Sequence, residues 1–395
     1  MSNKKIKIAL FALSVTFFAV GVTEFISVGV LPSVAHEFHI STSTAGLITT
    51  IYALGVALGA PILTLVTVNL VKKRVISGGL IIFVIGHLLI TFAPNFNTIL
   101  IGRFIAGSAH GLLFALSSTI AAELVGESKQ ASAIAFIFSG FTIATAIGAP
   151  LGTSVSVYFG WRIPFFIIAI LGFIAFILNT MILPITQPSF KKINLLSQLK
   201  LVIHPHIILT LLITILGYGG TFAAFTYLSP ILEKITHIQV NYISFILVIY
   251  GIAIAVGNSL GGKLGNNNPI KILLIIFIIQ AIALFTFFFT ETNATLAIIN
   301  IIVLGLVAFM SVPVLQSYVL SLAKSYQPDA VEIASSLNIS SFSFGIVLGS
   351  FIGGKVISNI DLAHTTIAAG ILVTLAILLI YFEIKMENRR INIKL

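Results

Sequence analysis

Twelve long apolar runs constrain this chain more than any other feature of its sequence. A helix needs roughly 20 apolar residues to cross a hydrocarbon core of about 30 Å, and runs near or above that length alternate here with charged residues, Pro, Gly or Asn. The runs cover residues 7–31, 43–70, 75–93, 97–121, 130–157, 163–184, 206–229, 240–262, 270–289, 295–321, 331–357 and 366–383. Only 8% of the 395 residues are charged, too few for the surface of a soluble domain. We therefore expect an all-α membrane protein with twelve transmembrane helices.

The basic residues predict how these helices are oriented. Lys and Arg in short loops stay on the cytoplasmic side, and with twelve spans both termini share one side. Of the 21 basic residues, only Arg103, Arg162, Lys234 and Lys355 fall on the other side. We expect both termini in the cytoplasm. The net charge of +10 is thus a topology signal, and no nucleic-acid partner is expected.

The chain also divides into two similar halves. A stretch of mixed polarity at 185–205 follows the sixth span, which predicts an N-terminal bundle over 1–184, a cytoplasmic linker over 185–205 and a C-terminal bundle over 206–395. Glycines recur at offsets of about 200 residues, and so do a threonine and a proline. The recurring pairs are Gly55 and Gly257, Gly59 and Gly261, Gly148 and Gly349, Gly152 and Gly353, Thr23 and Thr221, and Pro32 and Pro230. Two six-helix repeats favour a transporter with a central cavity.

Ionisable residues inside a membrane are costly and mark functional sites. Glu24 is the one carboxylate that the spans place deep, whereas the other ten, Glu383 among them, fall in loops or at helix ends. Arg103 lies at a similar depth, roughly 10 Å below the outer interface, and His110 follows it two turns later on the same helix face. An acid, a cation and an imidazole in this order form a proton relay. The alternative is a structural ion pair beside a hydrogen-bonded core histidine.

Neither Glu24 nor Arg103 has an ionisable counterpart in the second half, so we expect proton coupling in the first half and substrate contacts in the second. The candidate substrate-binding residues are Tyr218, Phe222, Phe225, Gln316 and Asn338. The aromatic three are spaced to share one helix face, although packing aromatics would be spaced in the same way. The remaining sequence holds no catalytic triad, no metal-ligand spacing and no cysteine. We expect no enzyme, no cofactor and no metal.

Three motifs resemble the major facilitator superfamily, and in particular its bacterial drug:proton antiporter branch of arabinose-efflux-like, chloramphenicol-efflux-like and purine-efflux-like proteins. The segment TEFISVGVLPSVA (23–35) resembles the helix-1 signature that contains Glu24, and GRFIAGSAHG (102–111) resembles the helix-4 motif whose arginine corresponds to Arg103. The segment GFTIATAIGAPLG (140–152) resembles the antiporter motif of helix 5 through Gly140, Gly148, Pro150 and Gly152. One departure is the loop after helix 2, PILTLVTVNLVKKR (61–74), which lacks the acidic residue that the superfamily uses in a charge-relay gate.

The resemblance implies a function and a location. It implies proton-coupled efflux of small amphiphilic or aromatic compounds, drugs among them. The protein is expected to be a monomer in the bacterial cytoplasmic membrane, with both termini on the cytoplasmic side. A dedicated exporter of a metabolite, such as a purine nucleoside, a sugar or a secreted chelator, is the alternative on the same scaffold. A membrane sensor that transports nothing is disfavoured, because no sizeable soluble domain is present.

Overall fold

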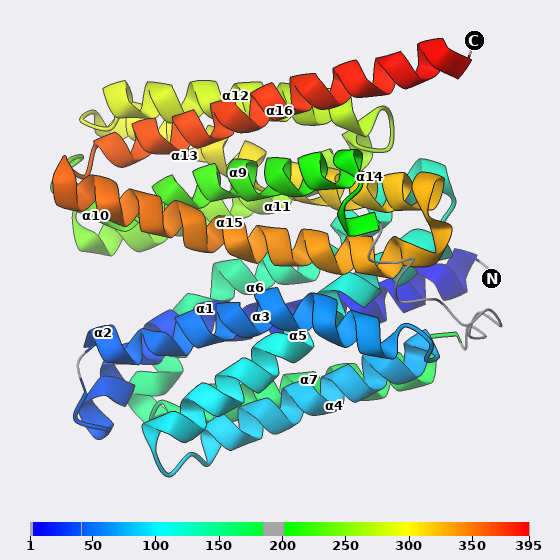
Figure 1. The fold of residues 1–395 in the computed structure, drawn as a ribbon. Helices are drawn as coiled ribbons and strands as arrows, with labels where there is room; N and C mark the ends of the chain where they lie inside the picture. Colours follow the sequence, from blue (N-terminus) through cyan, green and yellow to red (C-terminus); the bar gives the residue numbers. More distant parts are fainter. Residues whose placement is uncertain (1–2, 41, 185–200, 395) are drawn as a thin grey trace. The chain divides into compact units, whose positions relative to one another are not determined.

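The computed structural model describes residues 3–40, 42–184 and 201–394, and all its regular structure is helical (Figure 1). Most of the predicted linker, 185–200, lies outside these residues. The long helices are α1 (Asn3–Glu37), α3 (Leu47–Thr67), α4 (Lys72–Thr91), α5 (Phe96–Leu124), α6 (Gln130–Phe159), α7 (Arg162–Ile182), α9 (Pro205–Phe225), α11 (Val240–Leu264), α12 (Pro269–Thr290), α13 (Ala294–Ala308), α14 (Ser311–Tyr326), α15 (Val331–Asn359) and α16 (His364–Lys394). Shorter pieces are α2 (Thr42–Ala45), α10 (Leu228–Lys234) and the 3₁₀ turns Glu127–Lys129 and Pro328–Ala330.

The membrane-spanning character of the chain follows from these helices. Eleven segments of the described residues are long and apolar enough to cross a bilayer. The remaining predicted span, 130–157, coincides with α6, several of whose side chains fall outside the description. The predicted all-helical fold is confirmed.

Three of the predicted spans are broken, 43–70 between α2 and α3 and two others where a proline explains the break. Proline has no N–H, and its ring clashes with the carbonyl four residues earlier, so a helix is interrupted there. Pro230 lies four residues after Thr226, where α9 gives way to α10. Pro313 lies four residues after Phe309, where α13 gives way to α14.

The described residues form two compact units. Unit 1 comprises residues up to 198 together with Asp329–Ser340, so it includes the first ten residues of α15. Unit 2 comprises Leu199–Pro328 and Ser341–Leu395. In unit 1, α1 packs along α6, α3 packs along α5, and α4 contacts both α5 and α7 (Figure 1). In unit 2, α16 contacts α9 and α12, and α11 packs along α13.

Close helix contacts repeat between the units at the offset seen in the sequence. A Cβ on Gly55 would meet the carbonyl oxygen of Phe104 at 2.5 Å, and Gly257 is packed against the carbonyl oxygen of Leu306, 202 residues after Phe104. A side chain at either glycine would force the two backbones apart. Asn95 and Asn293, 198 residues apart, both cap the helix that follows them, α5 and α13. The two units are therefore built on one repeated plan.

Candidate functional site

Arg103 is the largest fully buried side chain of the chain as described, with 0% of its surface exposed. Its Nε donates to the carbonyl oxygen of Ile48 at 3.0 Å, and its Nη1 donates to Oγ1 of Thr23 at 3.0 Å. Nη2 is buried and has no hydrogen-bond partner within the described residues. A buried cation is costly unless it is paired and fully hydrogen-bonded, so one donor of this guanidinium is left for another acceptor.

A tyrosine and a histidine extend the site along the helix pair α3 and α5. The guanidinium carbon of Arg103 lies 3.9 Å from the centre of the Tyr52 ring, which is a cation–π contact. The Tyr52 hydroxyl is 2.9 Å from Nδ1 of His110, so His110 is linked to Arg103 through Tyr52. Gly107 on α5 packs against the backbone of Tyr52, and only a glycine permits this approach.

A second histidine completes the arrangement on the other side of Arg103. Nδ1 of His87 lies 2.8 Å from the carbonyl oxygen of Phe83, which can only accept, so Nδ1 carries the proton. Nε2 lies 2.6 Å from Oγ1 of Thr23. With Nε2 unprotonated, the Thr23 hydroxyl can donate to His87 while it accepts from Arg103. His87 therefore holds Thr23 in place for the arginine.

Glu24 lies next to Thr23 on α1 and is only partly buried. It is close enough to Arg103 and Tyr52 to interact with both electrostatically. Within the described part of the chain, however, no ion pair joins Glu24 to Arg103. The structure therefore brings Glu24, Arg103 and His110 into one region, with Tyr52 and Thr23 as the direct partners of the arginine.

The predicted aromatic group of unit 2 is also present. The Tyr218 ring centre is 5.0 Å from that of Phe222, and the Phe225 ring stacks on Tyr250 at 5.1 Å. Phe222 and Phe225 are partly exposed, whereas Tyr218 is buried. The two amide candidates are both fully buried, Gln316 in unit 2 and Asn338 in the part of α15 that belongs to unit 1.

Unit 2 contains an uncharged counterpart of the Arg103 site. Nε2 of Gln280 donates to Oγ1 of Thr221 at 2.8 Å, in the position that the His87–Thr23 contact has in unit 1. Thr221, Tyr250 and Ile301 follow Thr23, Tyr52 and Arg103 at an offset of 198 residues. These four unit 2 residues line a cavity of about 20 Å³.

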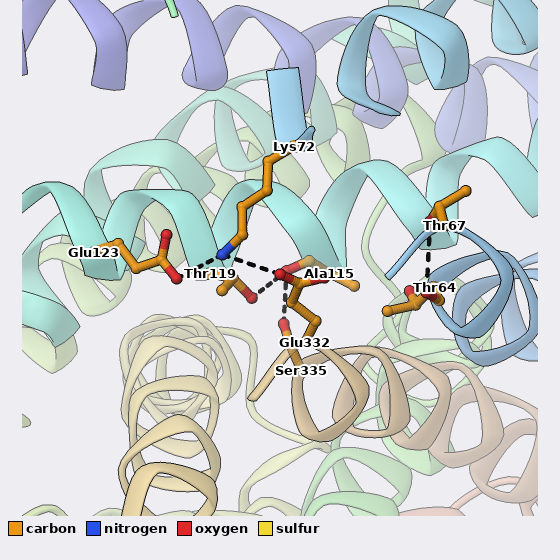
Figure 2. Close-up of polar contacts among 8 residues, drawn as sticks. All are labelled: Thr64, Thr67, Lys72, Ala115, Thr119, Glu123, Glu332 and Ser335. Atoms are coloured by element: carbon orange, nitrogen blue, oxygen red, sulfur yellow. Dashed lines mark hydrogen bonds and ion pairs between the residues drawn. The ribbon is translucent and has the colours of Figure 1, made fainter. Parts of the chain in front are cut away.

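An ion-pair cluster lies at the start of α4. Figure 2 shows Nζ of Lys72 between two carboxylates, 2.6 Å from Glu123 at the end of α5 and 3.0 Å from Glu332 at the start of α15. We call these three residues the Lys72 cluster. The superfamily pattern places an acidic residue and a following basic residue in the segment between helices 2 and 3. This chain keeps the basic residues there, and the carboxylates come from α5 and α15. Glu123 and Glu332 were assigned only to helix ends by the sequence, because nothing local indicates that they share a lysine.

Two serines of α15 bond the same segment to α5 and α3 within unit 1. Ser335 donates to the carbonyl oxygen of Ala115 on α5 at 2.6 Å (Figure 2). Ser340 donates to the carbonyl oxygen of Ala57 at 2.7 Å. Ala57 lies four residues before Pro61, whose missing N–H leaves that carbonyl without its helical partner. Ser340 thus supplies the hydrogen bond that the proline removes.

The helix-5 motif lies on α6. Gly140 packs against the carbonyl oxygen of Ser14 on α1, and Gly148 is buried. The side-chain surroundings of Pro150 and Gly152 lie outside the description. Close approach of α1 and α6 at Gly140 places Glu24, ten residues beyond Ser14 on α1, along the same helix pair.

Comparison with known proteins agrees with this architecture. A profile described as Major Facilitator Superfamily matches residues 13–331. The chain is 45% identical to YtbD of Bacillus subtilis (strain 168), an uncharacterized MFS-type transporter, over 98% of each chain. It is 34% identical to YdhP of Escherichia coli (strain K12), an inner membrane transport protein, over 97% of each chain.

Solved structures share the fold at low sequence identity. The transporter FucP in its outward conformation matches with a TM-score of 0.79 and 18% identity, over 96% of this chain and 99% of that one. The human organic anion transporter MFSD10 also matches with a TM-score of 0.79, at 15% identity, over 96% of this chain and 100% of its own.

Proposed function

The chain belongs to the Major Facilitator Superfamily and is a secondary transporter rather than an enzyme, and we propose that it exports small amphiphilic or aromatic compounds, drugs among them, in exchange for protons. The bundles 1–184 and 206–395 alternate access to a site near the membrane midplane. By analogy with YdhP, an inner membrane transport protein, we place it in the bacterial cytoplasmic membrane, as a monomer with both termini inside. The small-molecule substrate and protons are its partners.

The observation that carries this proposal is the incomplete hydrogen bonding of Arg103 beside Glu24. Nη2 of Arg103 is buried without a described partner, and Glu24 is the nearby acid. An ionised Glu24 is drawn to this guanidinium, whereas a protonated Glu24 is released from it. Protonation of Glu24 thereby changes the contact between α1 and α5, and substrate binding competes with the proton.

The free energy that the membrane potential supplies per proton is sufficient for export. Each proton that moves inward contributes about 2.3 kcal/mol per 100 mV of membrane potential, so one-for-one exchange of a neutral compound sustains a gradient. Aromatic compounds would stack on Phe222 and Phe225, whose rings lie 5.7 Å apart and are partly exposed. The Lys72 cluster joins the first turn of α15 to α4 and α5 within unit 1.

Proton release from the purified protein tests the proposal. Dyes, antibiotics, purines and sugars are added in turn to the protein in weakly buffered detergent, and the pH of the solution is followed. Release by amphiphilic aromatic compounds supports the proposal, and release by one metabolite class alone points to a dedicated exporter. Release by none of the four groups contradicts proton-coupled export of this kind.

A substitution then tests the coupling residue. Glu24→Gln keeps the size and removes the titration, so it should bind substrate and exchange it down a gradient, yet lose accumulation driven by a pH gradient in inverted vesicles. Glu127→Gln, in the turn before α6, is the matched control and should accumulate substrate normally. Full proton-driven accumulation by Glu24→Gln would remove this residue from the mechanism.

A further inference from the structure

Glu383 is a buried carboxylate of unit 2, at the end of the unit where α9 begins. Glu383 has 0% of its surface exposed and lies eleven residues before the end of α16. The sequence-based assignment of Glu383 to a helix end was wrong, because α16 continues to Lys394 instead of ending near residue 383. Glu383 falls within the apolar span His364–Glu387, where a carboxylate is costly.

Only one of the two carboxylate oxygens of Glu383 has hydrogen-bond partners among the described residues. Its Oε1 accepts from the Tyr318 hydroxyl at 2.8 Å and lies 2.6 Å from Nδ1 of His206. Its Oε2 is buried and has no hydrogen-bond partner in the parts of the chain described. We call Glu383, His206 and Tyr318 the Glu383 cluster. An ionised carboxylate with one bare, buried oxygen is expensive, and adding one proton removes that cost.

We propose that the Glu383 cluster binds and exchanges one proton, as a second proton site of the transporter in unit 2. His206 provides the route, because 10% of its side chain is exposed while Glu383 is fully enclosed. A proton from water binds the imidazole, the Nδ1 proton moves to Oε1 of Glu383, and the imidazole is left neutral. Release follows the same steps in reverse, and the net change is one proton bound or lost.

Among the described side chains, His206 is the one basic group within ion-pair distance of Glu383, and Lys324 on α14 and Lys385 on α16 form no ion pair with it. On α14 the nearby titratable groups are Tyr318 and Tyr326, and Tyr326 stacks on His206 at 5.3 Å. The His204 ring, before α9, lies 3.9 Å from the same tyrosine ring in a tilted contact. On α12 the one ionisable side chain is Lys271, which is exposed. On α16 itself Glu387 lies one turn further on and repels a charged Glu383. Each of these groups is compatible with a carboxyl that gains and loses a proton.

The alternative is a fixed ion pair between a charged His206 and a charged Glu383. Infrared difference spectroscopy separates the two possibilities, because a protonated carboxyl absorbs apart from a carboxylate. Acid-minus-alkaline spectra of the full-length protein should contain a carboxylic-acid band from a buried group, and Glu383→Gln should remove it. Glu387→Gln, one turn along the same helix, is the control and should retain it. A band untouched by Glu383→Gln overturns the proposal.

A second variant keeps the test decisive if Glu383→Gln fails to fold. His206→Asn can still donate a hydrogen bond to Glu383 but cannot relay a proton, so the band should persist while its appearance after a rapid pH jump slows at least tenfold. An unchanged rate, or a spectrum without a buried carboxyl band in both His206→Asn and the unsubstituted protein, contradicts the proposal.

The role of the cluster in transport rests on the proposed proton-coupled export, whereas its proton binding does not. We therefore repeat the infrared measurement in a Glu24→Gln background. Persistence of the Glu383 band there, together with export by the unsubstituted protein that does not depend on a pH gradient, would retire the proposed function and leave the proton site. Absence of the band, together with proton-coupled export by the unsubstituted protein, would retire the proton site and leave the proposed function.

Discussion

Breaking the Lys72 cluster should release the first turns of α15 from α4 and α5. Lys72→Met keeps the aliphatic stem and removes the charge from two ion pairs, at 2.6 Å to Glu123 and 3.0 Å to Glu332. The Lys72 and Glu332 side chains are only 20% and 17% exposed, whereas Glu123 is 40% exposed. Exposed pairs contribute about 0.2–1 kcal/mol, and hydrogen bonds to charged groups about 1.5–3 kcal/mol. We expect a loss of about 2 kcal/mol, a roughly 30-fold shift toward the released state.

Thiol labelling measures this release directly, because the chain has no cysteine of its own. Ala334 is fully buried in the segment of α15 that the cluster holds. In an Ala334→Cys background, Lys72→Met should raise the labelling rate by roughly the factor above. Lys73→Met, which changes the neighbouring charge, is the matched control and should leave the rate unchanged.

Burial also predicts an order among the acidic partners. Glu332→Gln should approach the effect of Lys72→Met, and Glu123→Gln should give a smaller one, because Glu123 is the more exposed partner. Lys72→Arg preserves the charge, so labelling of the cysteine in the Ala334→Cys background should stay as slow as it is with Lys72 in place. The reasoning is refuted if Lys72→Met and Lys73→Met label alike, or if Glu123→Gln exceeds Glu332→Gln.

Three further outcomes are expected. Gly140→Leu should lower the free energy of unfolding by roughly 1–3 kcal/mol and reduce transport, because a Cβ there meets the backbone of α1. Gly78→Leu is the control and should change neither, because Gly78 has open space around it. Thermal unfolding and uptake measure the two effects. Burial raises the pKa of Glu291 from 4.5 to about 7, and Asp361 adds to the rise, so the neutral carboxyl stabilises the fold at low pH. This contribution to the free energy of unfolding is at most about 3 kcal/mol and is lost as pH rises through 7. The dependence of Tm on pH should therefore be flatter in Glu291→Gln than in the unsubstituted protein. Reporters fused at the C-terminus should read cytoplasmic and reporters in the loop between α4 and α5 external, and an external C-terminus would contradict the predicted orientation.

The helices were predictable because a bilayer demands long apolar segments. Each of the twelve runs has a helix or a broken pair of helices over it, and most ends agree within a few residues. The breaks near Pro230 and Pro313 were not predicted, and a proline alone does not reveal them, because Pro61 lies inside the unbroken helix α3. The length of α16 was not readable, because its last turns are polar and leave the apolar pattern that marks a span.

The partners of the buried charges could not be read in the same way. Counting residues along α1 and α5 places Glu24 and Arg103 at one depth, but it does not reveal that a tyrosine ring and a threonine hydroxyl are the direct partners of Arg103. The contact between Lys72 and Glu332 joins residues 260 positions apart. A single sequence carries no signal for such a pair, because each residue alone resembles an ordinary helix end.

The two repeats show what distinguishes a charged site from its uncharged copy. In unit 1 the guanidinium of Arg103 occupies the space between Thr23 and Tyr52, and one of its donors is left over. In unit 2 the shorter Ile301 stands at the corresponding position, and a small cavity opens beside it. To turn the unit 2 site into a charged site like that of Arg103, a cation and a nearby acid would have to be introduced together, since either alone would be buried without a partner. This requirement explains how a duplicated fold can keep its charges in one half and a neutral pocket in the other.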